Sequence, residues 1–164
     1  MASGKRRRTS VASSPRALKR FRRDFRWDGV ALQPYKSRTD NAGEFAGASR
    51  QVIAGDRGEP IAFELRYFEL APGGFTSLER HRHCHVVIGL RGRGEVTIGA
   101  RQHRVAPFDA IYIAPNRVHR LRAIGRESFG FFCIVNRERD KPRRIVTRTT
   151  RPRRFVTGSS KLQR

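Results

Sequence analysis

The stretch ERHRHCHVVIGLRGRG, residues 79–94, decides how the rest of the chain is interpreted. It brings Glu79, His81, His83 and His85 close together in a protein that has 5 histidines in all. A carboxylate and imidazoles at this density indicate a metal site. On a straight strand, rising about 3.3 Å per residue, positions 81 and 85 would stand about 13 Å apart, whereas ligands bind a metal at about 2.0–2.2 Å. The chain must therefore bend, and a turn over residues 82–84 would place Glu79 and His81 on one strand and His85 on the next.

Outward from this stretch, the sequence has the pattern of short β-strands. Apolar runs, alternating or continuous, are separated by turn residues at intervals of about 8–12 residues, and a helical period is hardly present. The turn Pro72-Gly73-Gly74 should end the first strong strand. We therefore expect an all-β sandwich or barrel. The predicted strands are 61–70, 86–90, 95–98, 102–105, 110–113, 119–123 and 129–136.

The spacing of the histidine-rich stretch resembles the first sequence motif of the cupin family. That motif runs Gly, five residues, His-x-His, three or four residues, Glu, six residues, Gly. Here Gly73 is followed after five residues by Glu79-x-His81, then after three by His85, and after six more by Gly92. The outer ligands are exchanged, because Glu79 stands where the first His usually is and His85 where the Glu is.

A second and weaker match leads from Pro107 through Pro115 to His119 and lacks the glycines and terminal Asn of the second cupin motif. The resemblance covers residues 50–143. It implies a cupin double-stranded β-helix, a jelly-roll-like barrel with a metal in its mouth. The segments FELRYFELAPGG, LERHRHCH, LRGRG and GFFCIVNRERDKP resemble more closely a group of manganese-dependent cupin enzymes acting on a methylthio sugar phosphate. This implies cleavage of the methylthio carbon–sulfur bond with a thiol, such as glutathione, as acceptor.

The predicted metal ligands are Glu79, His81, His85 and His119. Three imidazoles and a carboxylate suit a divalent transition metal and are too nitrogen-rich for calcium or magnesium. Manganese is expected first, with iron, nickel or zinc as alternatives. Glu79 could instead form a surface ion pair with a neighbouring arginine, and a lone histidine such as His119 could be structural.

Two residues are candidates for catalysis. Cys133 shares one face of the last strand with residues 129, 131 and 135. It is either an inert buried thiol or, if that face lines the barrel, a thiol near the metal that could serve sulfur transfer. Tyr112 is either a proton donor to the substrate or an aromatic core residue.

Three residues are candidates for substrate binding. His83 should lie at the mouth of the barrel, in the turn between the two ligand strands. Arg66 and Arg122 could clamp a phosphate, because a guanidinium binds it through two parallel hydrogen bonds, or could be surface charges. His103 should be exposed on a hairpin.

The sequence has a net charge of +22, concentrated towards its two ends. We expect disordered basic tails at 1–25 and 144–164, a segment at 26–49 that docks on the barrel or on a partner, and the barrel at 50–143. Basic arms can bind nucleic acid or acidic partners, but no DNA-reading motif accompanies the charge. Two cysteines without metal-type spacing favour a reducing, cytoplasmic location, and no apolar run is long enough for a membrane span.

An apolar stripe of Trp27, Val30, Leu32 and Tyr35 precedes the predicted barrel. Exposed stripes often form contacts, so a homodimer is expected, or else the stripe covers an edge of its own barrel.

The sequence leaves two functions open. The first is a metal-dependent enzyme on a small, phosphorylated or enolisable substrate. The alternative is a non-catalytic ligand- or metal-sensing cupin whose basic arms contact nucleic acid or acidic partners. The missing DNA-reading motif favours the enzyme.

Overall fold

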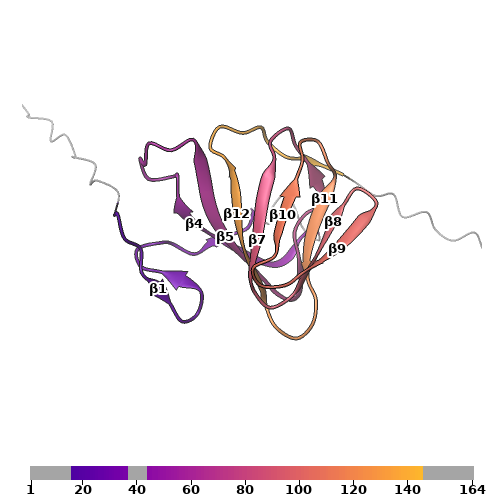
Figure 1. Ribbon diagram of the computed structural model, residues 1–164, viewed down its shortest axis with the longest axis horizontal. Coiled ribbons are helices and arrows are strands. Elements are labelled where there is room, and N and C mark those ends of the chain that lie inside the picture. The colour runs from indigo at the N-terminus through magenta and orange to yellow at the C-terminus, as the bar shows by residue number, and fades with distance from the viewer. Residues whose placement is uncertain (1–15, 37–43, 146–164) are drawn as a thin grey trace, which may run out of the picture.

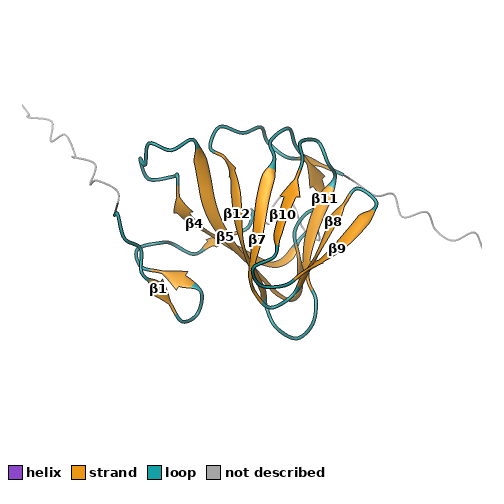
Figure 2. Cartoon of the chain, viewed as in Figure 1, coloured by secondary structure: helices purple, strands orange, loops and turns teal. Residues whose placement is uncertain are grey.

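The structure, a computed structural model, describes residues 16–36 and 44–145 (Figure 1). In this part of the chain it contains strands and no helix (Figure 2), which confirms the predicted all-β class. No helix there is long and apolar enough to cross a membrane. Residues 1–15 and 146–164 of the predicted tails lie outside the described residues.

The strands are β1 (Phe21–Arg22), β2 (Arg26–Trp27), β3 (Gln33–Pro34), β4 (Ala46–Ala54), β5 (Phe63–Phe75), β6 (Glu79–Arg80), β7 (His85–Arg91), β8 (Gly94–Ile98), β9 (Arg101–Val105), β10 (Ala110–Ile113), β11 (His119–Ala123), β12 (Phe129–Asn136) and β13 (Arg143–Arg144).

Apart from the small β1–β2 hairpin, the strands form two layers that share β5 and close into a barrel. One layer runs β10, β7, β12, β5, β4 and β3. The other contains β9, β8 and β11, and β11 also pairs with the end of β5 and with β6. In Figure 1 the strands β4, β5, β12, β7 and β10 stand side by side across the molecule, and β11, β8 and β9 follow at its other end. Every predicted strand is present, with ends within two residues of the prediction except at the end of β5.

Strand β5 does not end at Pro72-Gly73-Gly74, and this part of the prediction is wrong. The strand runs 13 residues, through these three and on to Phe75. Its pairing with β4 passes from Ala48 opposite Leu70 to Ala46 opposite Phe75, so residues 71–74 bulge out of the ladder. Gly74 is required there, because a Cβ would lie 2.8 Å from one carbonyl oxygen and 2.9 Å from another. The bulge lets one strand serve both layers.

Alternation along the strands fills the barrel. On β12 the side chains of Phe129, Phe131, Cys133 and Val135 are all buried, as the sequence pattern predicted. They join apolar residues of the opposite layer in a single core cluster. Because removing apolar surface from water is the main favourable term in folding, this row fixes which face of β12 points inward. Polar residues on the same inward faces are thereby brought into the barrel.

The N-terminal segment packs on the barrel of its own chain. Phe25 stacks on Tyr67 with ring centroids 5.7 Å apart, and Trp27 contacts Tyr67 and Phe132. Tyr35 belongs to the barrel core. The predicted boundary at residue 25 therefore falls within a folded hairpin, β1–β2. Leu32, by contrast, is 51% exposed, so the predicted stripe is divided between its own barrel and solvent.

Candidate metal centre

The predicted bend brings the ligands together. Strand β6 ends at Arg80, the chain bends over Arg82 and His83, and β7 begins at His85. Because β6 pairs with β11 and β7 pairs with β10 and β12, the bend joins the two layers and is not a hairpin turn. In β6, Glu79 lies directly opposite His119 of β11. A carboxylate from one strand and an imidazole from its neighbour are thus placed on the same face.

Two overlapping groups of side chains could hold a metal ion. Glu79, His81 and His119 form one, and His81, His83 and His85 form the other, with the ligand atoms of each group within 4.8 Å of one another. His81 belongs to both, and its Nε2 lies 2.7 Å from Nε2 of His85. Two ring nitrogens so close need a proton or a shared cation between them. The four predicted ligands are therefore divided between two groups that share His81, and His83 belongs to the group that contains His85.

Backbone carbonyls orient two of these rings. Nδ1 of His81 lies 2.8 Å from the carbonyl oxygen of His83, and Nδ1 of His119 lies 2.8 Å from that of Arg117. A carbonyl can only accept, so each Nδ1 carries the proton and each Nε2 keeps its lone pair. A hydrogen bond from the other ring nitrogen fixes the orientation of a metal-binding histidine in this way. The residues present thus fit a divalent ion bound through Nε2 atoms and a carboxylate.

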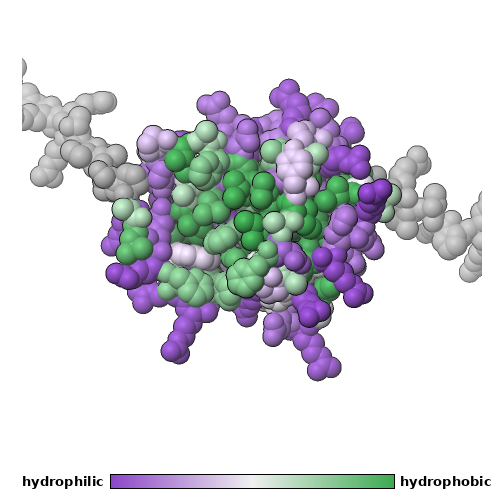
Figure 3. All heavy atoms as spheres, in the orientation of Figure 1, coloured by the Kyte–Doolittle hydropathy of each residue, from purple (hydrophilic) through white to green (hydrophobic). Residues whose placement is uncertain are grey.

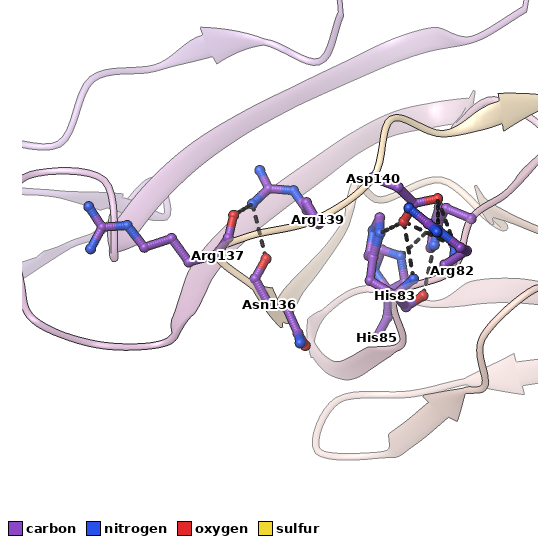
Figure 4. Close-up of polar contacts among 8 residues, drawn as sticks. Arg82, His83, His85, Asn136, Arg137, Arg139 and Asp140 are labelled. Atoms are coloured by element: carbon purple, nitrogen blue, oxygen red, sulfur yellow. Dashed lines mark hydrogen bonds and ion pairs between the residues drawn. The ribbon is translucent and has the colours of Figure 1, made fainter.

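His83 has a different partner, the carboxylate of Asp140. Nδ1 of His83 lies 2.9 Å from Oδ1, and the backbone N–H groups of Arg82 and His83 donate to the same carboxylate (Figure 4). These bonds, led by the one from Arg82, hold the pKa of Asp140 well below its usual range. The ring of His83 stacks on that of His81 at 3.6 Å. Asp140, from the segment after β12, therefore fixes the bend between the two ligand strands.

The imidazoles are kept neutral. Burial lowers the pKa of His81, His83, His85 and His119, and at His85 the neighbouring His119 and His81 lower it further. Desolvation disfavours the charged ring, and a second charged ring nearby adds repulsion. Neutral imidazole is the form that binds a metal.

Glu79 is ion-paired with Lys36, which also donates to Oγ of Ser77 at 3.2 Å. The alternative of a surface pair with a neighbouring arginine is wrong, because Glu79 is buried and its partner comes from the segment before β4. The carboxylate oxygen in this contact is Oε2, and Oε1 takes no part in it. Lys36 therefore closes the carboxylate side of the site.

Cys133 lies inside the cavity, 3.0 Å from Nδ1 of His85 and 3.4 Å from Nη2 of Arg66. Burial raises the pKa of this thiol, and the charge of Arg66 opposes that rise. The face of β12 that carries Cys133 therefore lines the barrel, which is the condition under which this thiol could serve sulfur transfer. A sulfur is thus placed between an imidazole of the metal centre and a guanidinium.

These groups line a cavity of about 210 Å³ that also includes Arg50 and Arg139. Of the two predicted phosphate-binding arginines, Arg66 lines it and Arg122 does not. The side chain of Arg122 is 57% exposed and lies 4.0 Å from Glu95 on the outside of the barrel. The odd and even positions of β11 face opposite ways, so His119 inside requires Arg122 outside.

Tyr112 is also outside. It is 62% exposed and pairs across the ladder with Val86, which is itself on the outer face of β7. Neither predicted role, proton donor in the cavity or core residue, matches this position. The prediction for His103 is confirmed, because this residue is exposed on β9.

Four cavity or bend residues were not predicted: Lys36, Arg50, Arg139 and Asp140. Arg50 lies on β4, where Gln51, Val52 and Ile53 are all buried, so burial does not alternate and gives no direction for its side chain. The other three lie outside regular strands, where no periodicity shows the direction of a side chain.

The chain matches proteins of one family in sequence and in structure. Residues 66–135 match the cupin domain model. The chain is 41% identical over 133 residues to a 1-methylthio-D-xylulose 5-phosphate methylsulfurylase of Rhodospirillum rubrum, covering 81% of this chain and 83% of that protein. A crystal structure of a cupin-2 domain from Rhodospirillum rubrum is 41% identical with a TM-score of 0.69, over 80% of this chain and 85% of that one. A cupin 2 conserved barrel domain protein from Rhodopseudomonas palustris is 38% identical with a TM-score of 0.72, over 79% and 87%. With the barrel and the histidine-lined cavity, these matches show that the chain belongs to the cupin family.

Proposed function

We propose that this protein is a metal-dependent enzyme that cleaves the carbon–sulfur bond of a methylthio sugar phosphate and transfers the methylthio group to a thiol. The observation that carries the proposal is the buried thiol of Cys133, 3.0 Å from Nδ1 of His85 in the cavity of the predicted metal ligands. The 41% identical methylsulfurylase supports the choice of substrate.

The metal would be held by Glu79, His81, His85 and His119, with manganese expected first. When bound, a divalent ion supplies Lewis acidity that stabilises negative charge on oxygens beside the breaking bond. His83, fixed by Asp140, faces the cavity and remains available to the substrate. Burial of the site excludes water, which would otherwise protonate the leaving carbon indiscriminately.

In this proposal Cys133 reacts as a thiolate, which the Arg66 guanidinium stabilises against the effect of burial, and attacks the sulfur of the methylthio group. A sulfur–sulfur bond forms, the carbon–sulfur bond breaks, and its electron pair stays on the carbon next to the carbonyl. An incoming thiol gives that carbon its proton, and the resulting thiolate then attacks the methyl disulfide on Cys133. The products are the sugar phosphate with hydrogen in place of the methylthio group, a mixed methyl disulfide and the regenerated Cys133. The carbon is reduced and the thiol sulfur is oxidised, so no further oxidant is needed.

The test is to incubate the manganese-loaded protein with 1-methylthio-D-xylulose 5-phosphate and glutathione and to measure glutathione methyl disulfide by mass spectrometry. We expect turnover by the wild-type protein and loss of it in Cys133→Ser, with the metal content unchanged. Without glutathione, the wild-type protein should carry one methylthio group on Cys133. Full activity of Cys133→Ser would refute the role of this thiol, and absence of the disulfide product with loaded metal would refute the reaction.

A further inference from the structure

Arg66 is a buried cation that forms no ion pair with any residue that the structure describes. It is only 8% exposed, and its Nε has no hydrogen-bond partner among the described residues. Its Nη2 reaches a sulfur, that of Cys133, at 3.4 Å, and none of the ion pairs found in the described part of the chain includes it. Buried charges are normally paired, because desolvation of an unpaired ion is costly. A guanidinium left in this state at a cavity wall marks a place for an anion.

Two further arginines stand on the same wall. Arg50 projects from β4, and its pKa is lowered by burial and then by the charge of Arg66, so the two guanidiniums repel each other. Arg139 is paired with Glu64 at 2.8 Å and is held by the carbonyls of Asn136 and Arg137 (Figure 4). The carboxylate of Glu64 thus pairs with Arg139, whereas Arg50 donates to the neutral Oε1 of Gln33, so the surplus positive charge lies at Arg66 and Arg50.

We propose that Arg66 and Arg50 form an anion subsite that binds the phosphate monoester end of the substrate, with Arg139 adding to the positive field. Guanidinium groups bind phosphate through paired hydrogen bonds, and the fixed fork of Arg66 is already oriented by stacking over the ring of Phe68 at 5.1 Å. This inference rests on the proposed function for the identity of the phosphate ester.

The position of Cys133 gives the substrate a direction. In the sheet Cys133 is the direct partner of Arg66, and its sulfur also contacts His85. A sugar with its phosphate on the arginines would therefore extend past the thiol, with its other end towards the imidazoles. The structure accordingly separates a subsite for the phosphate from the centre for the chemistry.

The test is calorimetric titration of the full-length protein with D-xylulose 5-phosphate, D-xylulose and glutathione. The wild-type protein should bind the phosphate ester at least tenfold more tightly than the free sugar. Arg50→Gln and Arg66→Gln should each remove about tenfold or more of that preference, the usual value of a hydrogen bond to a charged group. Arg122→Gln removes the same charge from the outer face and serves as the matched control, with no change expected. If Arg66→Gln does not fold, as judged by its melting transition, Arg50→Gln carries the test.

Equal affinity of the wild-type protein for the sugar and its phosphate would overturn the subsite. So would an Arg50→Gln protein that loses affinity for glutathione and keeps it for the phosphate ester, since the arginines would then bind the carboxylates of the thiol. Methyl disulfide formation with an unchanged KM in both arginine variants would refute the subsite and leave the reaction standing. Phosphate-dependent binding without that product would refute the reaction and support the subsite.

Discussion

The two walls of the cavity are built from different strands and hold opposite kinds of group: the imidazoles come from β7, β11 and the bend before β7, and the arginines come from β4, β5 and the segment after β12. On the imidazole wall, Nδ1 of His81 and of His119 each have a backbone acceptor, and the rings are neutral by burial. On the arginine wall, Arg66 is charged and its Nε is unpaired. The first wall offers lone pairs to a cation, and the second offers N–H donors to an anion. The hydrogen-bond partners of a buried group, more than its burial alone, therefore indicate whether a surface can bind a cation or an anion.

The imidazole wall is tested most severely by removing one of its ligands. His119→Ala should lose the metal and lower turnover by more than roughly a hundredfold, because even outer-shell changes cost 10–100-fold. His83→Ala should retain the metal, since the four predicted ligands Glu79, His81, His85 and His119 are unchanged in this variant. Metal analysis after dialysis, with His103→Ala as an exposed control, decides between these expectations. Full occupancy in His119→Ala would contradict the ligand assignment.

The neutrality of the imidazole wall predicts a pH dependence of the metal-free protein. The pKa values of His85 and His119 are lower in the folded protein than the ordinary value of 6.5, so the unfolded chain binds more protons as the pH falls. The free energy of unfolding should thus be retained above pH 6.5 and decline as the pH falls below it.

Urea denaturation of the metal-free protein at two pH values measures this decline. Glu59, whose pKa is lowered to about 2 chiefly by the backbone N–H of Arg57 and by Lys19, affects stability only at still lower pH. His103→Gln should leave the decline unchanged, whereas His119→Gln should reduce it. A stability independent of pH between about 7.5 and 5.5 would show that the rings are not held neutral.

A second comparison concerns two apolar residues of the N-terminal segment, Trp27 and Leu32. Trp27 covers Tyr67 and Phe132 of its own barrel, so Trp27→Ala should lower the free energy of unfolding by about 1–2 kcal/mol through lost apolar contact. Chemical denaturation measures it, with Leu32→Ala as the control, because Leu32 is about half exposed. Equal effects of the two substitutions would mean that the N-terminal segment does not stabilise the barrel.

The homodimer expected from the sequence remains a prediction, and the structure suggests a different surface for it. Figure 3 shows apolar side chains gathered at the centre of the face over β12, β7 and β10. Val86 of β7 and Tyr112 of β10 are exposed and are cross-strand partners. Light scattering should give the mass of a dimer, and Val86→Lys should shift it towards the monomer without lowering the melting temperature. A monomeric wild-type protein would refute the predicted homodimer.

Much of the fold could be predicted because alternation is a local property. The pattern of FGFFCIVN predicts both a strand and its inward row, and β12 has that row. The end of β5 was missed because Pro72-Gly73-Gly74 has the composition of a turn. Whether such residues turn the chain or bulge from a ladder depends on the neighbouring strand, here β4, which the local sequence does not specify.

The local sequence was sufficient to predict the candidate metal ligands, because the spacing from Glu79 to His85 and the later His119 leave few ways to bring imidazoles together. Which other residues face these candidate ligands depends on the tertiary structure. Tyr112 and Arg122 fall outside, while Lys36, Arg50 and Asp140 contribute from distant segments. The physical reason is that a strand fixes only the alternation of its side chains. Which of its two faces becomes the inside depends on the layer packed against it, and contacts such as Lys36 with Glu79 form only when the barrel closes.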